Sequence, residues 1–555
     1  MQRREFLKSS LLAGSATLLT RSRALGQSPS SSADAHIEIL LDEPLGAISP
    51  NLYGHFTEHL GGVIYDGIWV GEDSKIPNTG GIRKSITDRL RQIKAPVIRW
   101  PGGCFADSYD WKDGIGPRAK RPRRTNFWEV DPEAKRLAAN APQIYEPNTF
   151  GTDEFVHFCR LSGAEPYIAA NLRSLPAIDF DRWIEYCNSP AGSTTLADTR
   201  AASGFRDPFN VRYWGVGNES WGCGGNFTPQ DYATEFKRFT TWTPGYGVDL
   251  QLIASGSSDF DLDWARAFFE KLLTGRPFVN PNLFGWSVHY YTWNLSRGKT
   301  RDWVAGKGDA LSFDPVDWYE LFSQGMEMER IVHDQWSVLG EYDREHRIKL
   351  VVDEYGPWYR PGTALDPTHL LGQQITMRDA VHTALTLDIF NRNPEKVGMA
   401  ACAQLVNCLN ALFMSHEDKF IVTPNFHVFD LYSAHQGAEG IRAEFSAPRI
   451  HYDRDGKPAA FAGLNGAASR KNNTVTVTVV NPSVHAARET ELLVRGGNVA
   501  SASASILSNA DLHAHNTFEH EGVSAPQSKD LTTRGNTVAC TFPPASVSRV
   551  TITLS

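Results

Sequence analysis

Between residues 50 and 410, short apolar runs alternate with longer amphipathic stretches. Eight of the short runs have the length of buried strands, namely Asn51–Phe56, Pro96–Pro101, Tyr167–Asn171, Val211–Gly217, Gln251–Ser255, Phe284–Tyr290, Ile348–Asp353 and Val397–Gln404. Several stretches between them have helical periodicity, as in Gly81–Ile93, Thr152–Ser162, Pro229–Thr241 and Asp263–Leu273. This alternation is typical of parallel βα units, so the sequence predicts an α/β fold with a (β/α)8 TIM barrel over residues 49–432.

The pattern changes in the last quarter of the chain. Asn473–Val480, Glu489–Val494 and Val547–Leu554 alternate apolar with polar residues and are separated by Ser, Asn and Gly. Alternation of this kind indicates antiparallel strands with one solvated face. We therefore expect a jelly-roll-like β-sandwich over residues 433–555, joined by an N-terminal strand within residues 36–48.

The first residues differ from the rest of the chain. Arg3 and Arg4 precede a short apolar stretch from Leu11 to Leu19, and small residues follow near Gly26. This order predicts a Tat-type signal peptide and linker over residues 1–35, with export to the periplasm or the outside of the cell. A disordered basic tail is the alternative. No stretch is long and apolar enough to predict a membrane span.

Charge and cysteine content narrow the functional classes. Lys and Arg number 55 against 63 Asp and Glu, a net charge of −8, which gives no basic footprint for nucleic acid. The seven cysteines contain no C-x-x-C pair, so neither a disulfide framework nor a zinc-finger site is readable, and we expect buried free thiols.

Two carboxylates stand where barrel enzymes carry their chemistry. Glu219 follows the fourth predicted strand and Glu354 follows the seventh, and such positions face each other across the C-terminal mouth of a barrel. Glycoside hydrolysis needs one carboxylic acid to protonate the leaving oxygen and one carboxylate to attack or to activate water. Either residue taken alone could instead be a solvated loop acid.

Six motifs along the chain resemble glycoside hydrolase family 51 α-L-arabinofuranosidases over nearly the whole mature length. They are Tyr53-Gly54-His55-Phe56-Thr57-Glu58-His59-Leu60, Arg99-Trp100-Pro101-Gly102-Gly103-Cys104-Phe105, Gly217-Asn218-Glu219, His289-Tyr290-Tyr291, Asp353-Glu354-Tyr355 and Ala403-Gln404-Leu405-Val406-Asn407. The resemblance implies an exo-acting, retaining enzyme that releases terminal α-L-arabinofuranosyl groups from arabinan, arabinoxylan or related oligosaccharides. It also implies a homo-oligomer, and the chemistry needs no metal or organic cofactor.

The resemblance further implies a role for individual residues. Glu219 would be the general acid/base and Glu354 the nucleophile. The residues expected to contact the sugar are Glu58, Arg99, Cys104, Trp128, Asn218, His289, Tyr291 and Gln404. A role for Arg99 in the site is also expected independently of the resemblance, because a buried guanidinium can orient a carboxylate. A purely structural salt bridge is the alternative. His289 is either a structural histidine, which we favour, or a proton shuttle.

The expanded loop from Arg118 to Phe150 contains a basic cluster, Lys120 to Arg124. We expect this cluster to be a solvated face, and a site for acidic pectic chains is the alternative.

Other functions are less consistent with the motifs. His55-Phe56-Thr57-Glu58-His59 matches the H-x-x-E-H motif of inverted zinc proteases, but that chemistry needs a helix, and Pro50, Gly54 and Gly61 surround the motif. A non-catalytic carbohydrate-binding protein would not need both carboxylates. A β-xylosidase or an endo-β-glucanase could use the same barrel and the same pair, and the fold alone does not choose between them.

Overall fold

The computed structural model describes residues 33–130, 145–258, 260–274, 283–293 and 306–555. Residues 1–32 of the predicted signal segment therefore lie outside the described residues. Among the described helices, none has both the length and the apolar character that a membrane crossing requires.

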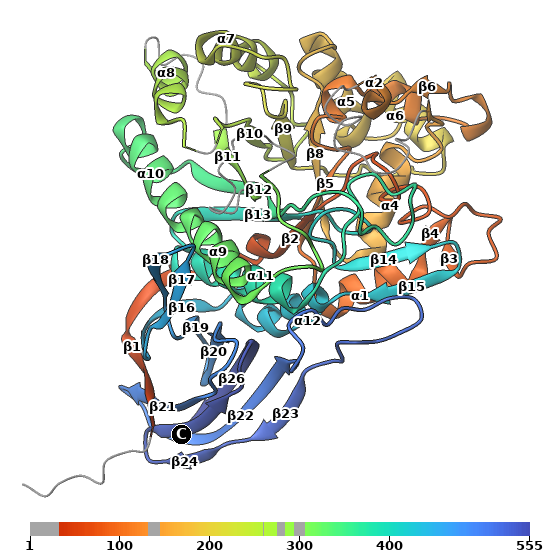
Figure 1. Cartoon of the computed structure of the whole chain (residues 1–555). Helices are drawn as coiled ribbons and strands as arrows, with labels where there is room; N and C mark the ends of the chain where they lie inside the picture. Colours follow the sequence, from red (N-terminus) through yellow and green to blue (C-terminus); the bar gives the residue numbers. More distant parts are fainter. Residues whose placement is uncertain (1–32, 131–144, 259, 275–282, 294–305) are drawn as a thin grey trace, which may run out of the picture. The chain divides into compact units, whose positions relative to one another are not determined.

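Eight parallel strands form a closed barrel in the order β10-β11-β12-β13-β2-β5-β8-β9 (Figure 1). Their bounds are β2 (Gly54–Phe56), β5 (Val97–Trp100), β8 (Glu165–Ala170), β9 (Tyr213–Val216), β10 (Gln251–Ala254), β11 (Leu283–Thr292), β12 (Lys349–Pro357) and β13 (Val397–Ala403). The predicted fold class is confirmed, because each predicted apolar run overlaps one of these strands.

The first barrel strand is shorter than predicted. Pro50–Tyr53 forms a 3-10 helix, and only Gly54–Phe56 is extended. Pro50 suits the first position of a helical turn because it has no N–H to leave unpaired, and the Ser49 side chain accepts a hydrogen bond from the Asn51 N–H at 3.2 Å.

Several helices between the strands begin at residues that favour helix starts. Thr228 caps α7 (Pro229–Thr240) and Asp314 caps α9 (Pro315–Gly325), each followed by a proline at the first helical position. The remaining helices are α1 (Lys84–Ile93), α2 (Phe127–Val130), α4 (Thr152–Ser162), α5 (Ala177–Asn188), α6 (Thr195–Ala202), α8 (Leu262–Leu273), α10 (Glu327–Tyr342), α11 (Met377–Arg392) and α12 (Pro424–Tyr432).

A layer of side chains fills the barrel interior beneath its C-terminal mouth. It consists of Val97, Tyr167, Tyr213, Ile253, Val351 and Met399. Packing here makes the barrel a solid support rather than a pore.

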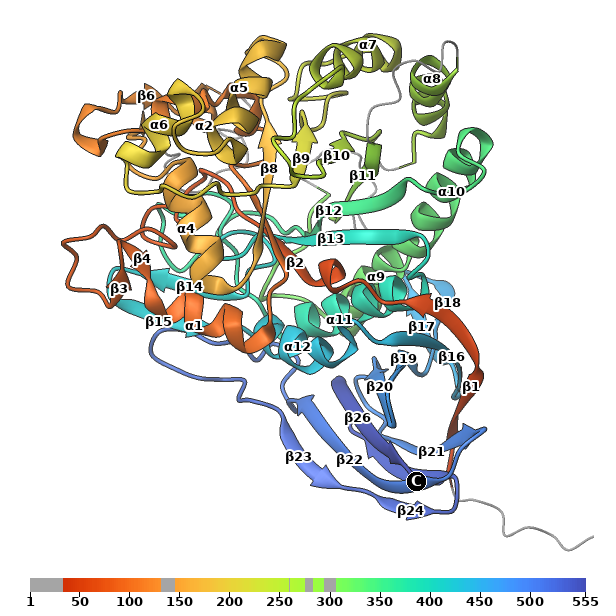
Figure 2. The ribbon, with the colours of Figure 1, turned by 180° about the vertical axis from the view of Figure 1, so that it is seen from behind.

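The C-terminal strands form a ten-stranded sheet in the order β23-β22-β26-β20-β19-β16-β1-β21-β25-β24 (Figure 2). The N-terminal strand β1 (Ala35–Ala47) lies inside this sheet, antiparallel to β16 (Glu439–Ser446) and parallel to β21 (Arg488–Arg495). The other strands are β19 (Asn465–Lys471), β20 (Thr474–Asn481), β22 (Val499–Ser508), β23 (Gln527–Asp530), β24 (Thr532–Arg534), β25 (Thr537–Phe542) and β26 (Ser546–Leu554). The sheet contacts the barrel through α11, where the Thr478 hydroxyl donates to Asp388 at 2.6 Å.

Most of the basic cluster from Lys120 to Arg124 is exposed, as we expected, and Arg121 is the exception. The Arg121 side chain is buried and donates to both carboxylate oxygens of Glu154, at 3.0 and 3.1 Å. Arg124 pairs with Asp113 at 2.7 Å. The buried Arg121–Glu154 pair holds the loop to α4, whereas the Arg124–Asp113 pair lies at the surface, where the Arg124 side chain is 60% exposed.

Candidate active site

Asp353 and Glu354 both reach the barrel mouth because strand β12 carries a β-bulge. Ser287 of β11 pairs with Val351, but His289 pairs with Glu354, so β12 has one extra residue in this interval. A bulge re-aims side chains that would otherwise alternate. Asp353 and Glu354 are consecutive, yet both contact Arg99.

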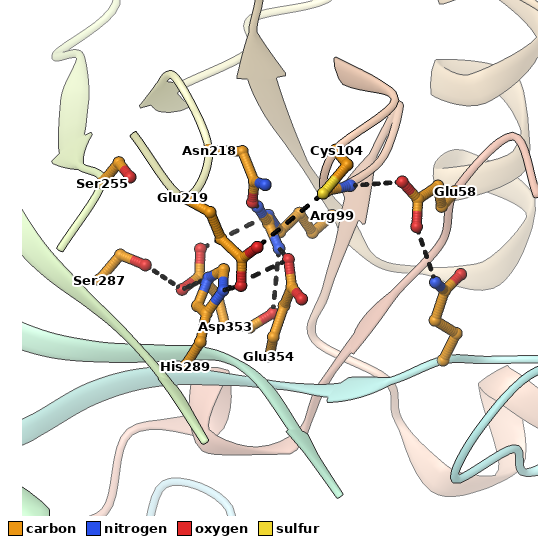
Figure 3. Close-up of polar contacts among 12 residues, drawn as sticks. Glu58, Arg99, Cys104, Asn218, Glu219, Ser255, Ser287, His289, Asp353 and Glu354 are labelled. Carbon is orange, nitrogen blue, oxygen red and sulfur yellow. Dashed lines mark hydrogen bonds and ion pairs between the residues drawn. The ribbon is translucent and has the colours of Figure 1, made fainter. Parts of the chain in front are cut away.

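Arg99 is the centre of the polar network in Figure 3. Its guanidinium is buried, donates to Glu354 at 2.7 Å and to the Asn218 side-chain oxygen at 2.5 Å, and pairs with Asp353 at 3.4 Å. Arg99 thus holds the Glu354 carboxylate through one hydrogen bond, not through the paired hydrogen bonds that we expected.

His289 lies between the two motif carboxyls. Its Nδ1 is 3.0 Å from Glu219 Oε1 and 3.6 Å from Glu354 Oε1, and its Nε2 is 3.3 Å from Asp353 Oδ1. The nearest side-chain atoms of Glu219, His289 and Glu354 all lie within 4.8 Å of one another. We call Arg99, Glu219, His289, Asp353 and Glu354 the carboxyl cluster. His289 therefore contacts both motif carboxyls directly, and its role, structural histidine or proton shuttle, stays a prediction.

The electrostatics of the carboxyl cluster follow from its burial. Burial opposes a charge on His289, but the Glu354 charge and hydrogen bonds to Asp353 and Glu219 raise its pKa to about 10. Burial also raises the pKa of Glu354, while the charges of His289 and Arg99 oppose that rise. For Asp353, burial is outweighed by Arg99 and His289, which hold its pKa well below the usual range.

Glu354 has a second donor on its other oxygen. The Tyr291 hydroxyl donates to Glu354 Oε2 at 2.9 Å. The predicted residue Tyr291 is thus brought into the site, where it contacts the carboxylate itself.

Glu58 and Gln404 form a neighbouring pair. Glu58 accepts hydrogen bonds from the backbone N–H groups of Gly103 and Phe105 and from the Gln404 amide at 3.0 Å. Burial and the nearby Glu354 charge raise the pKa of Glu58 to about 8, so it is largely uncharged near neutral pH. The Gln404 carbonyl oxygen is buried without a hydrogen-bond partner among the described residues, which leaves an acceptor for a bound hydroxyl.

Gly103 is required by space. A Cβ at this position would lie 2.8 Å from Glu354 Oε1. The glycine therefore keeps room beside the Glu354 carboxylate.

Asp107 organises the loops that carry the site, a role that the sequence did not indicate. It is fully buried and accepts hydrogen bonds from the backbone N–H groups of Leu172, Arg173 and Asn218, at 2.8 to 3.1 Å. Three backbone donors onto one carboxyl tie the loops after β5, β8 and β9 together.

Cys104 is part of a disulfide with Cys223, which corrects the expectation of free thiols for these two residues. The bond joins residues that are 119 positions apart, so their proximity exists only in the folded barrel. The sulfur atoms of Cys223 and Cys104 lie 3.5 and 3.9 Å from Glu219 Oε2. Because a disulfide sulfur has no proton, these are contacts and not hydrogen bonds, and Cys104 lines the site as half of a disulfide. The five other cysteines are buried and free, as expected.

Trp128 is the predicted site residue that the structure does not bring to the carboxyl cluster. It lies in α2 and is buried, and among the described residues no hydrogen bond or ring contact joins it to that cluster. Its indole N–H has no partner there, so it has a donor to offer a ligand.

The H-x-x-E-H motif is not a metal site. His55 lies on strand β2, buried, and is not on a helix. His59 accepts a hydrogen bond from the Trp100 indole at 2.9 Å and pairs with Glu146 at 2.8 Å, so both of its ring nitrogens are engaged. The metalloprotease alternative is excluded by this geometry.

The chain is similar to α-L-arabinofuranosidases over nearly its full length. Two family models match it, the Alpha-L-arabinofuranosidase 1 domain over residues 89–295 and the Alpha-L-arabinofuranosidase C-terminal domain over residues 353–546. An intracellular exo-alpha-L-arabinofuranosidase from Bacteroides ovatus is 33% identical over 523 residues, which are 94% of this chain and 95% of that protein.

Solved structures agree with this family. The glycoside hydrolase family 51 arabinofuranosidase from Xanthomonas axonopodis pv. citri is 33% identical and superposes with a TM-score of 0.84, over 94% of this chain and 100% of that one. The α-L-arabinofuranosidase from Thermotoga maritima, in its arabinose complex, is 28% identical with a TM-score of 0.78, over 94% and 100% of the two chains.

The predicted export is wrong. The Bacteroides ovatus relative, matched over 94% of this chain, is named an intracellular enzyme, which points against export. The prediction rested on the twin arginine and the short apolar stretch alone. Such a pattern does not by itself establish that a protein is exported.

We predict that reduction of Cys104–Cys223 destabilises the fold. A bond that closes a loop of 119 residues restricts the unfolded chain, so its loss is expected to lower the free energy of unfolding by about 2–5 kcal/mol. Denaturant unfolding with and without reductant measures this change, and the Cys104→Ser/Cys223→Ser variant serves as the control that reductant leaves unaltered. Seven titratable thiols in the unreduced, denatured protein, in place of five, would show that the bond does not form.

We also predict that His289 makes stability depend on pH. Its pKa is raised from 6.5 to about 10, so its contribution is fully present below pH 6.5 and is lost as the pH rises toward 10. The stability difference between wild type and His289→Gln should therefore shrink by roughly 1 kcal/mol per pH unit in this window. Urea unfolding at pH 6, 8 and 9.5 measures the difference, and a constant difference would mean that His289 is not charged in the folded protein.

Proposed function

Because the chain belongs to the α-L-arabinofuranosidases of glycoside hydrolase family 51, we propose that it is an exo-acting hydrolase that releases terminal non-reducing α-L-arabinofuranosyl groups with retention of configuration. The observation that carries the proposal is the placement of Glu219 and Glu354, whose nearest oxygens lie within 4.8 Å of each other and of His289. Retaining enzymes hold their two carboxyls about 5–5.5 Å apart, whereas inverting enzymes need a wider gap for a water molecule.

Glu354 acts as the nucleophile in this proposal. Its Oε1 faces Arg99 and its Oε2 faces Tyr291, and these two donors favour the carboxylate that attack requires. In the first step, a Glu354 oxygen forms a bond to the anomeric carbon as the bond from that carbon to the leaving oxygen breaks. The leaving oxygen takes the Glu219 proton.

Glu219 acts as the acid and then as the base. His289 holds its Oε1, so its Oε2 is the oxygen that delivers the proton. In the second step, Glu219 takes a proton from water while the water oxygen bonds to the anomeric carbon. The bond from that carbon to Glu354 breaks, and both carboxyls return to their starting states.

The relative burial of the two carboxyls supports exo action. The Glu354 side chain is 7% exposed and the Glu219 side chain is 20% exposed. The nucleophile thus lies deep in the site, where one terminal sugar ring can be held. The acid lies nearer the solvent, where the rest of the saccharide departs.

The polar groups around Glu354 provide contacts for the sugar hydroxyls. We assign this role to the unpaired Gln404 oxygen, the largely uncharged Glu58 and the Asn218 amide, whose orientation Arg99 fixes. Cys104 contributes an apolar contact, and Trp128 remains a predicted sugar contact. The homo-oligomer implied by the resemblance also stays a prediction.

We predict selective hydrolysis of an aryl α-L-arabinofuranoside over the corresponding β-D-xyloside. Glu354→Ala should abolish this activity, because it removes the attacking group. Glu219→Ala should lower kcat/KM by about 10²–10⁴-fold on oligosaccharides, and by less on aryl glycosides, whose leaving group needs little protonation.

Glu341→Ala, at an exposed glutamate outside the barrel mouth, is the matched control and should hydrolyse the arabinoside like wild type. Equal activity on both glycosides, or activity that survives in Glu354→Ala, would contradict the proposal.

A further inference from the structure

Two histidines and an aspartate meet at a second place in the fold. Asp66 lies in the loop between β2 and β3 (Asn78–Thr79), His369 in the loop between β12 and α11, and His416 at the end of β14 (Phe413–His416). Asp66 Oδ2 is 2.9 Å from His416 Nδ1 and 3.5 Å from His369 Nε2. The three facing atoms lie within 4.8 Å of one another, and none of these residues belongs to the carboxyl cluster.

The imidazole of His369 is aimed into this group, where its Nε2 faces Asp66 Oδ2 at 3.5 Å. Its side chain is 4% exposed, and its Nε2 has no hydrogen-bond partner among the described residues. A Cβ at Gly62 would lie 2.4 Å from this nitrogen, so only glycine leaves room for the ring. The nearest partner of this buried nitrogen is a carboxylate oxygen at 3.5 Å, and a bound ion would satisfy it better.

Other polar groups surround Asp66 and His416 and hold them in place. Asp366 Oδ2 lies 3.4 Å from His416 Nε2, on the side of the ring that points away from Asp66. Asp66 Oδ1 accepts a hydrogen bond from the Glu417 N–H at 2.7 Å and lies 3.8 Å from Arg83. A carboxylate behind a histidine fixes its tautomer and orientation, as it does behind zinc ligands.

We propose that Asp66, His369 and His416 form a Zn²⁺-binding site. Zinc bonds of about 2.0–2.1 Å in a tetrahedron separate neighbouring ligand atoms by about 3.3 Å, close to the distances from Asp66 to the two histidines. Two imidazoles with one carboxylate favour zinc over Ca²⁺ or Mg²⁺, which prefer oxygen ligands. Asp66 and His416 are each about one-third exposed, so water can occupy the fourth position.

The site would connect three loops of the barrel mouth. These loops follow β2, β12 and β13, the strands that precede or carry Glu58, Glu354 and Gln404. Zinc here would stabilise their arrangement and take no part in the bond-breaking steps. The proposal therefore does not depend on the proposed hydrolysis.

The test is metal content and stability of the full, untagged chain. After removal of metal by a chelator and incubation with Zn²⁺, elemental analysis should find one zinc per chain, with a higher melting temperature than the metal-free protein has. His416→Gln should bind none at this site and should not be stabilised. Asp366→Asn should keep the ligands but bind zinc about 10–100-fold more weakly, because it loses the supporting carboxylate.

Two controls separate this site from other histidines and carboxyls. His513 pairs with Asp511 at 3.2 Å on the surface, so His513→Gln should bind zinc like wild type. Glu219→Gln alters the group of Glu219, His289 and Glu354, whose side chains also lie close enough to hold a metal ion. This variant should retain the zinc as well. Absence of zinc binding in wild type would overturn the proposal. So would zinc binding as tight as that of wild type in folded His416→Gln and Asp366→Asn.

Discussion

The Arg99 guanidinium is the group on which the active site depends. A buried cation is costly unless it is paired, and Arg99 meets Asp353, Glu354 and Asn218 within 3.4 Å. These partners come from β12 and from the loop after β9, so one side chain of β5 sets the relative position of three segments. His289 adds a second positive charge beside Asp353 and Glu354. The positive charges of Arg99 and His289 balance the negative charges of Asp353 and Glu354. These acids can therefore lie together in the buried mouth of the barrel.

The barrel could be predicted from the sequence because parallel strands buried on both faces leave continuous apolar runs. The acids Glu219 and Glu354 could be predicted for the same reason, since each follows such a run. Asp353 could not, because strand alternation places consecutive residues on opposite faces, and only the bulge in β12 brings both acids to Arg99. A bulge depends on how two strands pair, and the sequence of one strand does not reveal that pairing.

Long-range contacts account for the other differences. Cys104 and Cys223 have no local spacing signal, and only the folded barrel brings together the loops after β5 and β9, which are separated by β8. Asp107 looks like an ordinary loop acid until its three backbone donors are seen. Arg121 belongs to a basic run, yet Glu154 pairs with it inside the fold. The twin arginine shows the opposite error, because a local pattern suggested a destination that the intracellular relative contradicts.

The central claim is that Glu354 bonds to the sugar during turnover. Mass spectrometry of Glu219→Ala, quenched during hydrolysis of an aryl α-L-arabinofuranoside, tests it most directly. Without the base, the second step slows while the aryl group still leaves, so the covalent intermediate should accumulate. The account predicts a mass increase of one arabinosyl unit on the peptide that contains Glu354. A first-formed product of inverted configuration, or an adduct on another residue, would contradict it.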